Sequence, residues 1–167
     1  FTLQGDISKN AVILAAAYNG SKVVRWLVVN GVLQTPTEIT LPAAMGTAPC
    51  ATATGTNADS DLIVNSQGKN IILYSSTGVN KGSLSNTIID VDSNSTKYFE
   101  LNGYSYLAVF QSKQTANSPI GHNCRIVDIT DGFAAATIVN TTDRLGNDIN
   151  GNATGDVDVR YSNSPLS

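Results

Sequence analysis

The sequence predicts an all-β protein, from its composition, its short apolar runs and a strand order that repeats along the chain. The 167 residues include 17 Asn, 17 Thr, 16 Ser and 14 Gly, but only 2 Glu, 6 Lys and 5 Gln. Glu, Lys and Gln normally fill the solvent faces of helices, whereas Asn, Ser, Thr and Gly compete with helical hydrogen bonding. Val and Ile together number 27, which suits strands. The composition therefore argues against a helical bundle or coiled coil.

The first repeated unit is predicted over residues 5–56 and opens with Gly5-Asp6-Ile7-Ser8, followed by a turn at Lys9-Asn10. An unbroken apolar run and an alternating run come next, and these patterns are typical of a buried and a half-buried strand. Strands are expected at residues 5–8, 11–17, 23–29 and 32–41.

The second unit, residues 57–95, and the third, residues 96–152, follow the same order. In the third unit Asn102-Gly103 stands between the first two strands, and this dipeptide strongly favours a two-residue hairpin turn. Three strands are expected in the second unit (60–64, 71–74 and 87–91) and four in the third (97–101, 104–110, 124–129 and 133–140).

A fourth unit is predicted to begin in residues 153–167, where Gly155-Asp156-Val157 repeats the opening Gly5-Asp6-Ile7. A repeat of about 40 to 50 residues with four short strands is typical of a β-propeller blade. The sequence therefore predicts a single propeller-like region of three blades and the start of a fourth, with a β-sandwich as the alternative. Because a closed propeller needs at least four blades, the remainder of a larger propeller or another copy of the chain is an expected partner.

The stretches Asn150–Val157, Gly5–Ile7 and Val23–Trp26, the last followed by Asn30-Gly31, resemble secreted propeller-like proteins of unknown function from gut Bacteroidetes. The resemblance implies an extracytoplasmic setting: secreted, periplasmic or at the cell surface. It supplies no catalytic residues. The chain opens with Phe1 rather than Met, so any signal peptide or lipid anchor is expected to have been removed or to lie outside this sequence.

The charge distribution and the lengths of the apolar stretches argue against a nucleic-acid partner and a membrane-spanning helix, respectively. The net charge is −3, and the ten Lys and Arg are scattered singly, so the basic footprint of a nucleic-acid-binding protein is missing. The longest apolar stretch, residues 11–18, is far shorter than the roughly 20 residues of a membrane-spanning helix. We therefore expect neither a nucleic-acid partner nor a transmembrane segment.

The two cysteines, Cys50 and Cys124, lie 74 positions apart and lack the CxxC spacing of zinc or redox sites. Two alternatives stay open: a disulfide that closes a long loop, or two buried thiols.

A calcium site is one interpretation of the loop between residues 148 and 156. Oxygen-bearing side chains at positions 1, 3, 5 and 9 of such a loop can converge on Ca²⁺. The loop departs from the usual pattern, with Ala153 at the glycine position and Val159 in place of a bidentate Glu. The alternative is an inter-blade turn. The candidate ligands are Asp148, Asn150, Asn152 and Asp156.

Catalytic motifs are sparse. The only histidine, His122, has no other clustered ligand and no GxSxG sequence to accompany it, and a phosphate-binding glycine loop is missing. If the chain were a propeller enzyme, a glycoside hydrolase or lyase, its acids would be Asp residues at the central channel. The candidates, at equivalent blade-opening positions, are Asp6, Asp61 and Asp156.

Aromatic residues could provide stacking surfaces for sugars, but the alternating pattern predicts that Trp26 is buried between sheets. Tyr104 and Tyr106 should share one face of their strand. The leading functional prediction is therefore an extracytoplasmic, non-enzymatic module that recognises a glycan or a protein through loops of a propeller scaffold. The alternatives are the propeller enzyme and a structural component of a surface assembly.

Overall fold

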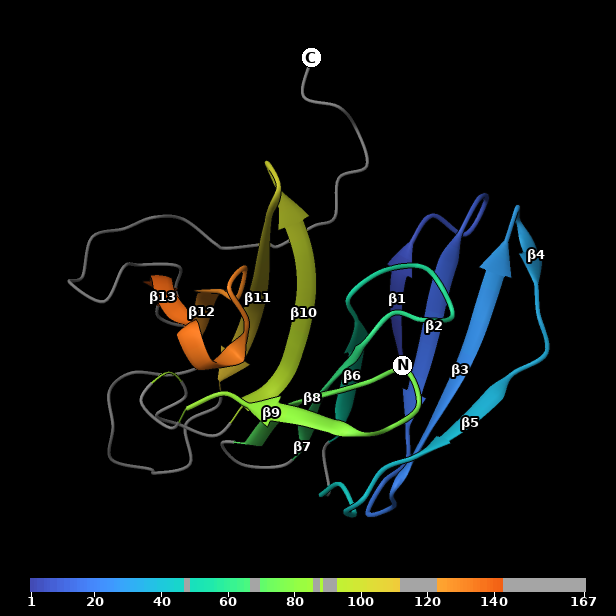
Figure 1. The fold of residues 1–167 in the computed structure, drawn as a ribbon, viewed down its shortest axis with the longest axis horizontal. Helices are drawn as coiled ribbons and strands as arrows, with labels where there is room; N and C mark the ends of the chain where they lie inside the picture. The colour runs from blue at the N-terminus through green and yellow to red at the C-terminus, as the bar shows by residue number, and fades with distance from the viewer. Residues whose placement is uncertain (47–48, 67–69, 86–87, 89–92, 112–122, 143–167) are drawn as a thin grey trace.

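Three antiparallel sheets, each built from consecutive strands, make up the fold (Figure 1). The computed structural model describes residues 1–46, 49–66, 70–85, 88, 93–111 and 123–142. The helical structure in these residues is one short 3-10 segment, η1 (Phe133–Ala135). None of the described chain forms a helix with the length and apolar character needed to cross a membrane. The all-β prediction is confirmed.

The first sheet confirms the strands expected at residues 11–17 and 23–29 and, in part, the one at 32–41. The strand expected at residues 5–8 is wrong: residues 6–10 form a turn, in which Asp6 Oδ1 accepts the N–H of Ser8, and the first strand precedes this turn. The strands of the sheet are β1 (Thr2–Gly5), β2 (Ala11–Ala16), β3 (Lys22–Val29), β4 (Val32–Leu33) and β5 (Thr37–Thr40). The expected fourth strand is divided, because β4 and β5 pair with opposite ends of β3. Between β3 and β4, Asn30 and Gly31 both have positive φ, 51° and 77°, as a tight hairpin turn of this kind requires.

The second sheet differs most from the prediction. Its strands are β6 (Cys50–Ala53), β7 (Leu62–Ser66), β8 (Asn70–Tyr74) and β9 (Asn80–Ser83). Strands β7 and β8 were expected, but they are the second and third strands of the sheet and not the first and second. Strand β6 lies within residues 5–56, which were predicted as the first unit, but it pairs with β7 and so belongs to the second sheet. The third strand expected at 87–91 falls almost wholly outside the described residues.

The third sheet has four strands, as the sequence predicts, but the last begins at Thr137 and not at residue 133, because Phe133–Ala135 form the 3-10 segment η1. The strands are β10 (Ser93–Leu101), β11 (Tyr104–Gln111), β12 (Asn123–Asp128) and β13 (Thr137–Thr142). Asn102 and Gly103 have φ of 53° and 83°, so the Asn-Gly hairpin is confirmed.

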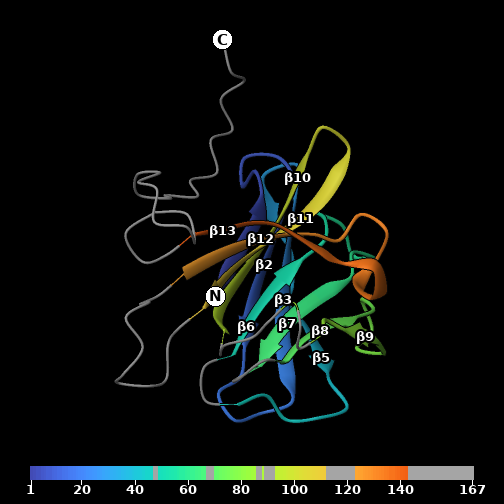
Figure 2. The ribbon, with the colours of Figure 1, turned by 90° about the vertical axis from the view of Figure 1, so that its left-hand side faces the viewer.

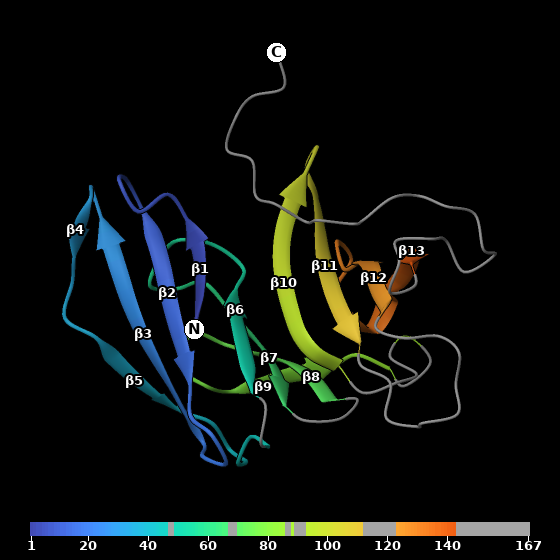
Figure 3. The same ribbon diagram turned by 180° about the vertical axis from the view of Figure 1, so that it is seen from behind.

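The second sheet lies between the other two (Figures 1 and 3). One face of β7 carries Leu62 and Val64, which pack into a core with Val12 and Leu14 of the first sheet. Its other face carries Ile63, which packs into a second core shared with the third sheet. Figure 2 looks along this stack, with the third sheet in front. Because side chains alternate across a strand, one strand can supply two cores.

Two buried arginines tie strands to neighbouring connections. Nη1 of Arg25, on β3, donates to the carbonyl of Ala58 at 2.6 Å, in the loop between β6 and β7. Nη1 of Arg125, on β12, donates to the carbonyl of Ile88 at 2.6 Å. Burial lowers the pKa of Arg25, against the opposing effect of the nearby Asp59 carboxylate.

The second and third sheets are meanders in which neighbouring strands are consecutive in the chain, and so are strands β1 to β4 of the first sheet, whose β5 returns to pair with β3. None of the three sheets closes on itself within the described residues. The same three layers fit an arc of a β-propeller and a stacked sandwich, so the prediction is confirmed at the level of all-β antiparallel sheets.

Candidate functional site

The first strands of the first two sheets lie alongside each other. The Thr2 hydroxyl, on β1, donates to the carbonyl of Ala51 on β6. Further along, Gly5 is so close to Thr56 that a Cβ on Gly5 would lie 2.4 Å from Thr56 Cγ2. Residues 2 to 5 thus follow residues 51 to 56 in the same direction, although β1 and β6 belong to different sheets.

The first strand of the third sheet continues this arrangement. Sγ of Cys50, on β6, lies 3.7 Å from the carbonyl of Thr96 on β10, and the backbone N–H of Tyr98 donates to Thr52 Oγ1 at 3.5 Å. The Lys97 amine reaches the carbonyl of Leu3 and so connects β10 to β1. Burial lowers the pKa of Lys97. Strands β1, β6 and β10 therefore run in the same direction around one region of the molecule (Figure 1).

A polar pocket of about 250 Å³ opens where these first strands end. Its walls come from all three sheets, since β1, β10 and the residues after β6 each contribute. The lining residues are Gln4, Thr54, Gly55, Thr56, Tyr98 and Glu100. Amide, hydroxyl and carboxylate groups thus meet at the junction of three separate sheets.

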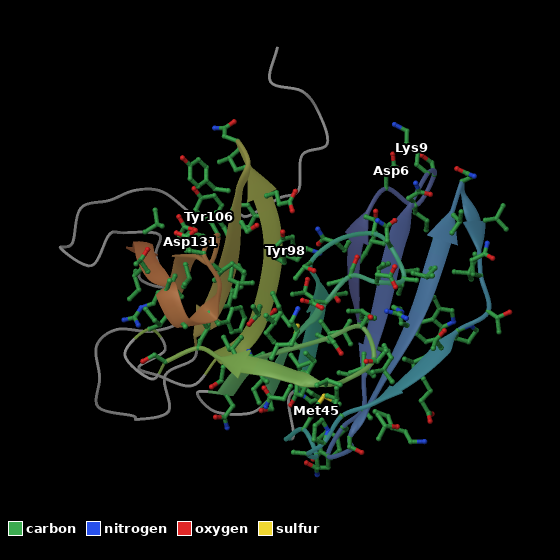
Figure 4. The ribbon with its side chains drawn as sticks, in the orientation of Figure 1. Asp6, Lys9, Met45, Tyr98, Tyr106 and Asp131 are labelled. Carbon is green, nitrogen blue, oxygen red and sulfur yellow. The ribbon has the colours of Figure 1, made fainter. Side chains whose placement is uncertain are left out.

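Glu100 is held at this pocket by Tyr98. The Tyr98 hydroxyl donates to Glu100 Oε1 at 2.6 Å and lies 3.2 Å from Ser105 Oγ. The Tyr98 ring belongs to the core between the second and third sheets, whereas Glu100 is exposed. A fixed aromatic anchor therefore orients a solvent-accessible carboxylate (Figure 4 labels Tyr98).

The loop after β6 positions the threonines of the pocket. It is closed by a hydrogen bond from the N–H of Thr54 to the carbonyl of Asp61 at 3.0 Å. Within it, the N–H of Asn57 donates to Ser60 Oγ at 3.1 Å. A Cβ at Gly55 would approach Ser60 Oγ to 2.8 Å, so the loop is tightly folded on itself.

The predicted channel residue Asp6 lies in the turn between β1 and β2 (Figure 4). Its Oδ1 accepts the backbone N–H of Ser8 at 2.8 Å and the Ser8 hydroxyl at 2.7 Å, and Lys9 Nζ lies 3.9 Å from Oδ2. These bonds from Ser8, with a smaller contribution from Lys9, lower the pKa of Asp6. Asp6 therefore caps its own turn, and it is not among the residues that line the pocket.

The predicted channel residue Asp61 immediately precedes β7 and forms an ion pair with Lys81. It is likewise not a lining residue of the polar pocket. Asp156 lies outside the described residues. Asp6 and Asp61 do not occupy corresponding positions: Asp6 directly follows the first strand of its sheet and donates its N–H to Asn10, whereas Asp61 directly precedes the second strand of its sheet and accepts the N–H of Thr54. Each carboxylate is engaged by a partner near its own sheet.

The calcium and disulfide predictions fall mainly on parts of the chain that the structure does not describe. Asp148, Asn150, Asn152 and Asp156 lie outside it, as does His122. Among the residues that are described, no group of three or more His, Cys, Asp and Glu side chains could hold a metal ion. Cys50 is placed beside β10, but the side chain of Cys124 is not described, so their pairing stays a prediction.

The aromatic predictions need one correction. Trp26 is half-buried and lies on the face of the first sheet that points away from the second, so the prediction of burial between sheets is wrong. Its neighbours Arg25 and Leu27 take the inward positions, because side chains alternate along β3. Tyr104 and Tyr106 do share a face, with ring centroids 6.4 Å apart.

The pocket was not predicted from the sequence. Its residues are spread from Gln4 to Glu100 and form no local motif. The signal that could have found them is positional, since all lie at the ends of first strands or just after them. That alignment depends on recognising β6, a strand of small residues, Cys50-Ala51-Thr52-Ala53.

These features define a class: an all-β protein of stacked four- and five-stranded antiparallel sheets whose first strands meet at a polar pocket. The chain belongs to a family known as DUF8500, a domain of unknown function, whose model matches residues 1–145. No curated protein and no solved structure matches the chain.

Proposed function

We propose that this protein is a ligand-recognition module that works outside the cytoplasm and binds a glycan at the polar pocket between its three sheets. The scaffold in this proposal is an arc of a β-propeller. In propellers, four-stranded meanders pack face to face around a central channel. The parallel course of β1, β6 and β10 across three sheets supports this scaffold, because it is the arrangement expected of strands that line such a channel.

The observation that carries the ligand class is the chemistry of the pocket. Sugars present many hydroxyl groups, which are recognised by a few well-placed amide, hydroxyl and carboxylate groups in a concave site. Gln4, Thr54, Thr56 and Glu100 supply these groups. A volume of about 250 Å³ is suited to one or two sugar units rather than to a folded protein surface.

The composition supports an extracytoplasmic setting. Thr, Asn and Ser are abundant, while Glu and Lys are few, which fits a secreted or surface protein better than a cytosolic one. A calcium ion bound by the 148–156 loop, as predicted from the sequence, is compatible with this setting.

The enzyme alternative has weaker support. Hydrolysis of a glycosidic bond normally needs two carboxyl groups about 5 to 9 Å apart. Among the described residues that line the pocket, Glu100 is the one carboxylate. Asp6 and Asp61 are committed to Ser8 and Lys81.

A glycan array, followed by calorimetry with the best hit, tests this proposal. Glu100→Gln should weaken binding about 10- to 100-fold, because a hydrogen bond to a charged group contributes about 1.5 to 3 kcal/mol. Glu38→Gln is the matched control: Glu38 is exposed, pairs with Lys22 at the far edge of the first sheet, and should leave binding unchanged.

Two results would contradict the proposal. An array without any bound glycan would favour the structural-component alternative. A bound glycan whose affinity responds equally to Glu100→Gln and Glu38→Gln would place its site away from the pocket.

A further inference from the structure

The three sheets stack in chain order, with one hydrophobic core between the first and second and another between the second and third. Each sheet uses one face toward the sheet before it and the other face toward the sheet after it. The first sheet uses Val12 and Leu14 toward the second, and the second uses Ile63 and Ile71 toward the third. The second sheet is thus covered on both faces, while each end sheet is covered on one.

The outer face of the first sheet is apolar. Ile13, Ala15, Trp26 and Leu33 line a shallow pocket of about 350 Å³ on it, together with Phe1. Leu33 is 60% exposed. The row is continuous across strands, because Ile13 pairs with Trp26 on one side and with Leu3 on the other.

The outer face of the third sheet is also apolar, and it is rich in aromatic rings. Its pocket of about 330 Å³ is lined by Phe99, Leu101, Tyr106, Ile126 and Val139. The rings of Phe99 and Tyr106 are stacked with centroids 5.4 Å apart. Val139 is 58% exposed. Neither end pocket is lined by a charged side chain.

The two faces lie at opposite ends of the stack (Figures 1 and 3). In each core between two sheets, a sheet turns one face, here called its forward face, toward the next sheet along the chain, which meets it with its opposite, rear face. The rear face of the first sheet and the forward face of the third are uncovered, so these two faces could pack against each other as the internal pairs do. The family match spans this set of sheets and stops at residue 145, just after β13 ends at Thr142.

We propose that a second copy of this chain covers both faces, with the first sheet of each copy packed against the third sheet of its partner. Two such contacts related by a twofold axis close a ring of six sheets. Each contact brings together four large apolar side chains of the first sheet, beside Ala15, and five of the third. Across its two contacts the dimer covers eight aromatic and ten large aliphatic side chains, which suits the roughly 1,200 to 2,000 Å² of total surface that a stable interface buries.

Sedimentation and light scattering of the full chain, from about 1 to 100 μM, test this pairing. The wild type should have twice its monomer mass of 17.5 kDa. Leu33→Asp and Val139→Asp each place a charge in both contacts of the dimer, so each should weaken pairing at least about 100-fold. Val79→Asp is the matched control, because Val79 is 63% exposed in the turn before β9, away from both end faces.

Mixing the two variants distinguishes this pairing from others. Leu33→Asp and Val139→Asp together can form a mixed dimer in which one of the two contacts is wild type, so the mixture should dimerise more tightly than either variant alone. Pairing of like faces would give no such rescue. Circular dichroism and thermal unfolding of each variant verify that it is folded.

A monomer at 100 μM would overturn the proposal, and so would an open series of species heavier than a dimer. A dimer that survives both substitutions would also overturn it, since its interface would then lie elsewhere.

Discussion

The middle sheet and the first sheet are built from similar strands, yet they are buried very differently. In β7, Leu62, Ile63 and Val64 are all at most 2% exposed, whichever face they occupy. In β2, Leu14 is 1% exposed, but its neighbour Ile13 is only half-buried. The difference shows that the place of a strand in the stack decides its burial, because β7 has a sheet on each side and β2 has one.

The largest expected loss of stability concerns two isoleucines, one in the closed core of the middle sheet and one on the open face of the first sheet. Ile63→Ala should lower the free energy of unfolding by about 3 to 4 kcal/mol, since it leaves a cavity in a closed core. Ile13→Ala, on the open face, should cost about 1 to 2 kcal/mol. Urea unfolding at low protein concentration, where copies do not pair, measures both. Equal losses would contradict the comparison.

Alanine substitutions at two glycines distinguish the cost of backbone strain from the cost of a steric clash between sheets. Gly78 and Gly103 have positive φ, 89° and 83°, and both lie in turns. A Cβ at Gly78 would lie 2.5 Å from the carbonyl of Thr40 in the first sheet, whereas at Gly103 it would meet nothing within 4 Å. Gly103→Ala should cost about 1 kcal/mol, from strain alone. Gly78→Ala should cost about 2 to 3 kcal/mol in the same thermal or urea unfolding assay, and a smaller loss than that of Gly103→Ala would argue against a close joint there.

A smaller effect is expected from the polar tie between the first and second sheets. Arg25→Met keeps the apolar stem but removes the hydrogen bond to Ala58, and should cost about 1 to 2 kcal/mol. Lys22→Met breaks an exposed ion pair with Glu38 and should cost at most about 0.5 kcal/mol. If unfolding curves showed the exposed pair to matter more, the Arg25 contact would not join the sheets.

The smallest effect concerns two turn carboxylates. Hydrogen bonds from Ser8 lower the pKa of Asp6, and those from Thr130 lower the pKa of Asp128. Because the folded pKa is depressed, the contribution of each carboxylate is present above its ordinary pKa and is lost as the pH falls through the folded value. NMR titration should find both values below those of an unstructured Asp. Ser8→Ala should raise the pKa of Asp6 without affecting Asp128, and a shift in both would indicate a global change.

The sequence predicted the elements whose evidence is local. Asn102-Gly103 identified its hairpin because both residues tolerate positive φ, and β7 and β8 stood out as apolar runs. Strands β6 and β9 were missed, since small or polar residues such as those of Asn80–Ser83 carry no apolar pattern and become strands only through their partners. Alternation placed Trp26 on one face of β3 but could not say which face meets another sheet.

The candidate site depends even more on tertiary structure. Residues of similar sequence context, Asp6 and Asp61, attracted attention as repeats but serve their own turns and ion pairs. The pocket combines Gln4, Thr56 and Glu100, which are brought together only when three first strands align. No local sequence pattern predicts that these three residues come together.

Native-state hydrogen exchange tests most directly the central claim that the middle sheet is the core of a stack with open ends. The amides shared by β7 and β8 should exchange only through global unfolding, because sheets cover them on both faces. The amides of β4, at the edge of the first sheet, should exchange by local opening and be far less protected. Protection of β4 equal to that of β7 and β8, or fast exchange in the middle sheet, would contradict the account.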